Sequence, residues 1–286
     1  MGTLVPMRYP TVLAAGAADH TYVKCGAGKA WACWGGKVGG TSLPGGSGST
    51  LRADKIAEPD GKAGINCYLV NGVCHQAANR ILLPAGVLVL GARGYRLSES
   101  LYGPYGRPSG PFGLCQAPFH QHRGVTGDDP GCDGPSSAFR VGEEEPPPNS
   151  RSYIDGALAI YGKAETTGGV LGADTQHPLM VELFMYMAHH ALGSALEGAT
   201  AGLLGEARSS TEHARMKLES AYGHEELAPG EFARLLDEET VRFQQHVADI
   251  LEEDAYYKLL ALKPGEWLTL ADPEIVNRGA GRAYTS

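Results

Sequence analysis

The residue pair Cys74–His75 is where side-chain types and spacing first suggest covalent chemistry. It follows the turn dipeptide Asn71–Gly72, and the pattern predicts a short helix over VCHQAANRIL (73–82), ended by Pro84, with Cys74 and His75 in its first turn. A helix N-terminus carries unpaired amide groups, which lower the pKa of a thiol and can stabilise an oxyanion. The segment is also polar where a core helix would be apolar. We therefore predict that Cys74 is a nucleophile.

A thiol nucleophile needs a base, and the best candidate in the sequence is His20. It opens the segment HTYVKC (20–25), which reads as a strand. A histidine on a strand facing a cysteine on a helix can take the thiol proton and later return it to a leaving amine. His75 is a poorer base for its neighbour, because adjacent helical side chains point about 100° apart.

Cys67 is a rival nucleophile within the same region. It lies in INCYLV (65–70), which reads as a strand closed by a turn, so it is better explained as a core thiol or as a disulfide partner of Cys74. We favour Cys74 over Cys67 because helix N-termini activate thiols.

Four further residues are candidates for substrate binding or for the oxyanion pocket: Tyr22, Trp31, His75 and Gln76. Tyr22 shares a strand face with His20 by alternation. Trp31 either forms an aromatic wall for a substrate or packs as a buried strand residue. His75 and Gln76 lie next to the nucleophile and are predicted at its rim.

DHTYV (19–23), followed after Gly-rich strands by NCYLVNGVCHQAANRIL (66–82), resembles the circularly permuted papain-like thiol enzymes. These are related to NlpC-type cell-wall peptidases and to lecithin:retinol acyltransferase. The similarity covers residues 15–100 and rests on residue order and local context. It implies a Cys nucleophile at Cys74 and a His base at His20.

The same resemblance implies a third polar residue that orients the histidine. The strand after His20 should carry it, but KAWACWGG (29–36) offers only Lys29 and Cys33. This is a departure from the family pattern, and it leaves the orienting group unassigned.

The fold class expected from these patterns is α+β. A small antiparallel sheet with the Cys-bearing helix, a papain-like core by resemblance, would occupy residues 1–110. A Gly/Pro-rich connection would follow over 111–150, and a helical region packed on the core over 151–286. The strands expected in the core are 20–25, 29–36, 65–70 and 87–95, with a mobile loop over 39–50.

Charge is distributed unevenly along the chain, and its pattern limits the classes of binding partner that are expected. Residues 1–110 carry 11 Lys and Arg against 5 Asp and Glu, whereas residues 111–286 carry 13 against 27. The basic residues are scattered, so nucleic-acid binding is not expected. No apolar run is long enough to span a membrane. The helical region offers a surface for a homo-oligomer.

No cofactor or metal is expected. Glu182 with His189, and Glu239 with His246, each share a helix face, but neither helix has the Glu-x-x-His pair of a dimetal bundle. The segment 11–18 makes a poor signal peptide, so the compartment is either cytoplasmic or reached by a non-classical export route.

Together these features predict a cysteine-dependent hydrolase or amidotransferase. It would act through a thioester on an amide bond of a peptide, a protein side chain or a cell-wall fragment. The alternative is a non-enzymatic binding module stapled by disulfides among six cysteines, at positions 25, 33, 67, 74, 115 and 132.

Overall fold

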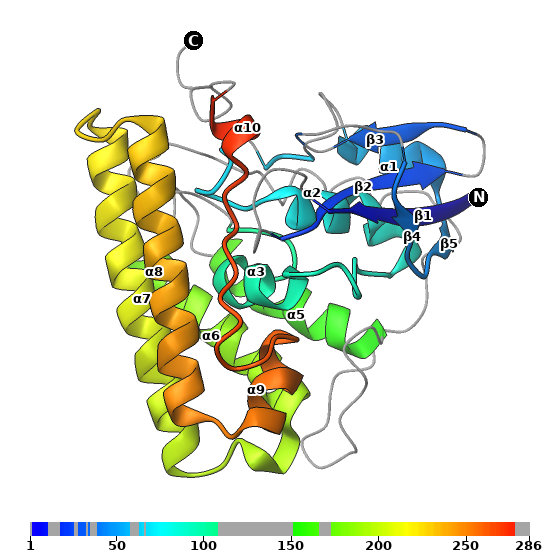
Figure 1. Ribbon diagram of the computed structural model, residues 1–286. Helices are drawn as coiled ribbons and strands as arrows, with labels where there is room; N and C mark the ends of the chain where they lie inside the picture. The colour runs from blue at the N-terminus through cyan, green and yellow to red at the C-terminus, as the bar shows by residue number, and fades with distance from the viewer. Residues whose placement is uncertain are drawn as a thin grey trace.

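The computed structural model describes residues 2–10, 18–25, 28–32, 34, 39–57, 63–65, 67–107, 151–165 and 173–277. Within these ranges the chain is α+β, with a small antiparallel sheet on one side and long helices on the other (Figure 1). The predicted connection over 111–150 lies outside the described residues.

The sheet has the strand order β3-β2-β1-β4, and β5 also pairs with β1. Its pairings are antiparallel, and the register between β1 and β2 sets Tyr9 opposite His20. The strands are β1 (Gly2–Tyr9), β2 (His20–Cys25), β3 (Ala30–Ala32), β4 (Thr41–Ser42) and β5 (Gly46–Gly48). The predicted strands over 20–25 and within 29–36 are therefore confirmed.

Two other strand predictions are wrong. In the segment 65–70, Leu69 takes a left-handed conformation with φ of 66°, and the amides of Val70 and Asn71 both donate to the carbonyl of Cys67. These bonds close a tight turn in place of a strand. The segment 87–95 likewise forms turns that lead into a helix at Tyr95.

The N-terminal strand β1 and the strands of residues 39–50 were not predicted. Pro6 interrupts the pattern of β1 and argues against a central strand. Its carbonyl nevertheless accepts a hydrogen bond from the amide of Leu43. The expected mobile loop over 39–50 instead supplies β4, β5 and the first residue of a helix.

The helical content divides into short helices near the sheet and long helices beyond it. The prediction of a helix at Cys74 is confirmed, and the described residues of the helical region expected over 151–286 are mostly helical. The helices are α1 (Thr50–Ala57), α2 (Cys74–Leu82), α3 (Tyr95–Tyr102), α5 (Arg151–Glu165), α6 (Ala173–Leu192), α7 (Ala199–Gly223), α8 (Pro229–Ile250), α9 (Glu253–Leu260) and α10 (Pro273–Asn277).

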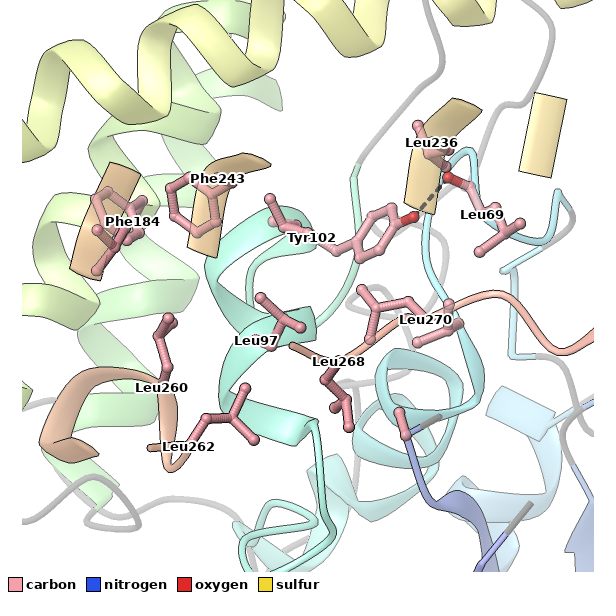
Figure 2. Close-up of a cluster of buried hydrophobic side chains, with 14 of the residues drawn as sticks. Leu69, Leu97, Tyr102, Phe184, Leu236, Phe243, Leu260, Leu262, Leu268 and Leu270 are labelled. Atoms are coloured by element: carbon pink, nitrogen blue, oxygen red, sulfur yellow. Dashed lines mark hydrogen bonds between the residues drawn. The ribbon is translucent and has the colours of Figure 1, made fainter. Parts of the chain in front are cut away.

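Two hydrophobic clusters join the sheet side to the helical side. In one, Leu4 and Ile81 share a core with Leu183 of α6. In the other, Leu97 and Tyr102 of α3 pack with residues of α6, α8 and the extended segment after α9 (Figure 2). Because each cluster draws side chains from both parts of the chain, the helical region completes cores that residues 2–107 leave open.

A buried ion network, defined here as Arg107, Arg208, Arg215, Glu212 and Glu219, links α7 to the turn before α2. Its side chains are at most 1% exposed. Arg107 pairs with both glutamates, Arg208 pairs with Glu212 at 2.8 Å, and Arg215 pairs with Glu219 at 3.7 Å. Buried charges are tolerated when they are paired in this way.

The network holds backbone carbonyls of the turn 67–72. Arg107 donates to the carbonyl of Val70, and Arg215 and Tyr102 both donate to that of Leu69 (Figure 2 draws the Tyr102 bond). Since this turn leads directly into α2, charges on the helical side help to position the first turn of the helix that carries the cysteine.

Gly106 provides a test of how tightly the turn is held. It has φ of +83°, and an added Cβ would lie 2.5 Å from the carbonyl oxygen of Asn71 and 2.6 Å from Ile65. We expect Gly106→Ala to lower the free energy of unfolding by about 2–4 kcal/mol in chemical denaturation. Gly202→Ala, in α7 with open space around its Cβ, is the control and should be neutral or stabilising. Equal losses in both variants would contradict this packing.

Candidate functional site

Cys74 is the first residue of α2, which confirms the prediction that it lies in the first turn of a helix. The N-cap residue is Val73, whose side chain has no acceptor atom to bond the amides of the first turn. The backbone amide of Val73 itself donates to Oε1 of Gln76, which fixes the entry of the chain into the helix. The first turn therefore places partial positive charge beside a thiol.

His20 begins β2, and α2 packs against this strand. Both side chains are buried, with Cys74 5% and His20 2% exposed. Burial raises the pKa of the Cys74 thiol, but the charge of His20, a hydrogen bond with His20 and the amide of Thr21 together bring it below its ordinary value. The structure thus brings together the two residues that the sequence singled out as a catalytic pair.

Asp19 anchors the backbone next to His20. Its carboxylate accepts from Arg8 at 2.9 Å and from the amide of Arg93 at 2.9 Å, and its own amide donates to the Arg93 carbonyl. The carbonyl of Asp19 faces the Cys74 sulfur at 3.9 Å. These contacts set the start of β2, and hence the His20 side chain, against the N-terminus of α2.

His75 holds the same carbonyl from the other side. Its Nε2 lies 3.0 Å from the Asp19 oxygen, and its Nδ1 lies 2.8 Å from Oγ of Ser98. In a neutral ring with its proton on Nε2, that nitrogen donates to Asp19 and Nδ1 is an acceptor for the single proton of the Ser98 hydroxyl, for which the carbonyl of Tyr95 at 2.9 Å is the other acceptor. Burial lowers the pKa of His75 to about 4, which favours this neutral form. His75 is therefore a positioning residue for the backbone at His20.

This burial predicts a pH dependence of stability. Unfolded His75 has a pKa of about 6.5, so below that pH the unfolded chain binds a proton that the folded chain resists. Stability is full above pH 6.5 and falls by up to about 3 kcal/mol as pH drops toward 4. His75→Gln should remove this part of the loss in urea titrations at pH 7 and pH 4.5, whereas the exposed His224→Gln should not. An identical loss in His75→Gln and wild type would contradict the assignment.

The other predicted binding residues have structural contacts. The Tyr22 hydroxyl donates to the carbonyl of Gly39 at 2.7 Å, and Nε1 of Trp31 donates to Asp54 at 3.1 Å. Gln76 uses its amide group on Ser98 and on the Gly103 carbonyl. Neither Tyr22 nor Trp31 lines the cavity beside Cys74, so the structure favours the packing interpretation of both.

The oxidation states of the described cysteines distinguish the two candidate nucleophiles, Cys74 and Cys67. Cys74 and Cys25 are free thiols, whereas Cys67 is disulfide-bonded, with a partner that lies outside the described residues. The expected pairing of Cys67 with Cys74 is therefore wrong. Of the candidates for the residue that orients His20, Lys29 pairs with Asp54, and Cys33 lies outside the described residues. The ring that lies against His20 is that of Tyr9, with centroids 5.0 Å apart.

Sequence reasoning missed two features of the site. Tyr68, expected on a strand, lies in the turn before α2 and faces a cavity of only about 10 Å³ together with Cys74 and His20. The extended segment between α9 and α10 covers the same cavity through Leu270 and Asp272. The apolar alternation of WLTLA was the signal for an extended segment, but nothing local indicated its partner.

Comparisons with known proteins assign no family. No family model matches the chain, and no curated protein and no solved structure is similar to it. Within the described parts of the chain, no cluster of three or more His, Cys, Asp and Glu side chains has the geometry to hold a metal ion. Among the described helices, none is both long and apolar enough to cross a membrane.

Proposed function

We propose that this chain is a cysteine-dependent hydrolase or amidotransferase that acts on an amide bond of a peptide, a protein side chain or a cell-wall fragment. The observation that carries the proposal is that His20 and Cys74 line the same small cavity at the N-terminus of α2, where the charge of His20 lowers the pKa of the thiol. A nucleophile paired with a base in this way is the arrangement that acyl transfer requires.

The chemistry follows from that geometry. The Cys74 thiolate attacks the carbonyl carbon of the amide, and the amides of the first turn of α2 stabilise the oxyanion. The imidazolium of His20 gives its proton to the leaving amine as the C–N bond breaks, which leaves a thioester on Cys74. Neutral His20 then takes a proton from water, for hydrolysis, or from an acceptor amine, for transfer, as the oxygen or nitrogen attacks the thioester carbonyl carbon. The C–S bond breaks, which restores the Cys74 thiolate and the imidazolium of His20 and releases the acid or the new amide.

We also propose that residues 15–100 form the core of a permuted papain-like enzyme. The order of His20 before Cys74, with β2 packed on α2, supports this relationship. The alternative of a binding module with six oxidised cysteines is disfavoured, because Cys25 and Cys74 are free thiols.

Acetylation by p-nitrophenyl acetate tests the proposal. The ester acetylates activated thiols, and peptide mass mapping then locates the acetyl group. Cys25 is an internal control, because it is also free and is 8% exposed against 5% for Cys74. We expect the acetyl group on Cys74 in preference to Cys25, followed by its loss to water or to an added amine. Equal labelling of both thiols would overturn the proposal.

A further inference from the structure

The extended segment of residues 268–272, called here the C-terminal strap, is bound along its main chain. At its start, the side-chain amide of Gln244 accepts from the amide of Leu268 at 3.0 Å and donates to the Leu268 carbonyl at 2.8 Å. One residue on, the carbonyl of Thr269 accepts from the amide of Ala18 at 3.1 Å. Both partners lie outside the strap, one on α8 and the other just before β2.

The remainder of the strap is held by two side chains. The carboxylate of Asp237 accepts from the amides of Leu270 and Ala271, at 3.0 and 3.1 Å. The hydroxyl of Tyr68 donates to the carbonyl of Leu270 at 3.1 Å and accepts from the amide of Asp272 at 2.9 Å. Seven hydrogen bonds over five residues are therefore made to backbone groups of the strap. Any polypeptide in the same conformation presents the same backbone groups.

The strap lies directly over the catalytic pair. Leu270 and Asp272 line the same cavity of about 10 Å³ as Cys74 and His20, and that volume has room for one water molecule at most. A carbonyl group, of a substrate or of an acylating ester, reaches the Cys74 sulfur only while the strap is displaced, so acylation of the wild-type thiol proceeds through transient opening of the strap. An amide-cleaving site of this kind must open before it can work.

The other side of the strap borders a larger space. Thr269 and Ala271 line a pocket of about 570 Å³ against α8, and Ala271 also lines the small cavity beside Cys74 together with Leu270 and Asp272. The side chain of Leu270 is 6% exposed and packs in the cluster of Figure 2. If the strap moved away, the pocket and the small cavity would join as one cleft that reaches Cys74.

We propose that the C-terminal strap is a tethered pseudosubstrate, and that the substrate is an extended polypeptide that takes its place. This inference rests on the proposed function and specifies its substrate class and its regulation. The incoming chain would use the main-chain partners Gln244, Asp237 and Tyr68, and would set an apolar side chain where Leu270 now lies. A small-molecule amide is too short to form hydrogen bonds with a row of main-chain partners that spans five residues.

The rate at which iodoacetamide alkylates Cys74 in the full chain tests the proposal. Asp237→Ala removes the acceptor for two strap amides, and Tyr68→Phe removes one hydroxyl while keeping the ring, so the second variant keeps the test valid if the first does not fold. Each change removes two hydrogen bonds to the strap, so we expect each to raise the rate about fivefold to thirtyfold, the effect of losing two bonds of modest net strength. Ile160→Ala, in the hydrophobic cluster that includes Cys74 but no residue of the strap, controls for general destabilisation and should leave the rate unchanged.

A peptide added in trans separates a pseudosubstrate from a simple cover. Leu270→Ala weakens the packing of the strap but keeps the main-chain partners Gln244, Asp237 and Tyr68 for a chain in trans. The peptide EWLTLADP, residues 266–273, should slow alkylation of this variant toward the wild-type rate, whereas a scrambled peptide should not. Unchanged alkylation in the variants, or faster alkylation that the peptide does not slow, would overturn the proposal. Failure of the catalytic pair is a separate result, because the ionisation of the thiol in wild type is measured without displacing the strap.

Discussion

Glu212→Gln is expected to lower the free energy of unfolding by about 3–5 kcal/mol, because it leaves three buried arginines with the single carboxylate of Glu219. Burial alone would raise the pKa of Glu212, but Arg107, Arg208 and Arg215 lower it to about 2. The change keeps the shape of the side chain and removes only its charge. Denaturant titration at pH 7 measures the loss.

Two controls define this result. Glu238→Gln breaks an exposed pair with Arg234 and should change the stability by less than about 1 kcal/mol. The contribution of Glu212 is present above its unfolded pKa of about 4.3 and is lost as pH falls toward 2, so wild type and Glu212→Gln should converge in acid. A loss no larger than that of Glu238→Gln would mean that the network does not hold the turn before α2.

His20→Gln is expected to slow the acetylation of Cys74 at pH 7 by about 10²–10⁴-fold, the usual contribution of a positioned base. Glutamine fills a similar volume but neither takes a proton nor supplies the charge that lowers the pKa of the thiol. The strap covers Cys74 equally in wild type and in His20→Gln, so the ratio of their two acetylation rates does not depend on how often the thiol is accessible. His224→Gln, at an exposed histidine, should leave the rate unchanged.

A change of less than tenfold in His20→Gln would remove His20 from the mechanism. His75 would not replace it as the base, because both of its ring nitrogens are engaged, one by Ser98 and the other by the Asp19 carbonyl.

Local sequence patterns were sufficient to predict the elements that carry Cys74 and His20, the proposed catalytic pair. The turn at Asn71–Gly72 and the Pro84 boundary located α2, and the Gly-bounded alternation located β2. The long helices followed from apolar residues at helical spacing. In each case the signal lies within one element, so no tertiary information is needed.

The remainder of the site depends on contacts between residues far apart in sequence. Tyr68 meets Leu270 and Asp272 across about two hundred residues, and the turn at Leu69 is held by Arg215 of α7. Strand alternation predicted that Tyr22 shares a strand face with His20. It did not predict the hydrogen bond from the Tyr22 hydroxyl to the carbonyl of Gly39. No local pattern shows that a distant segment will cover a thiol, so the strap was beyond prediction from sequence.

The ionisation of Cys74 is the most direct test of whether Cys74 and His20 form a catalytic pair. The ultraviolet absorbance of the thiolate, recorded against pH for wild type and for Cys74→Ala, gives the titration of this thiol as the difference, and it requires no access for a reagent. We expect the midpoint of the Cys74 titration to lie below the pKa of a free thiol, about 8.5, and to move upward in His20→Gln. A midpoint at or above that value, unchanged by His20→Gln, would show a buried thiol that burial alone controls, and would contradict a catalytic pair.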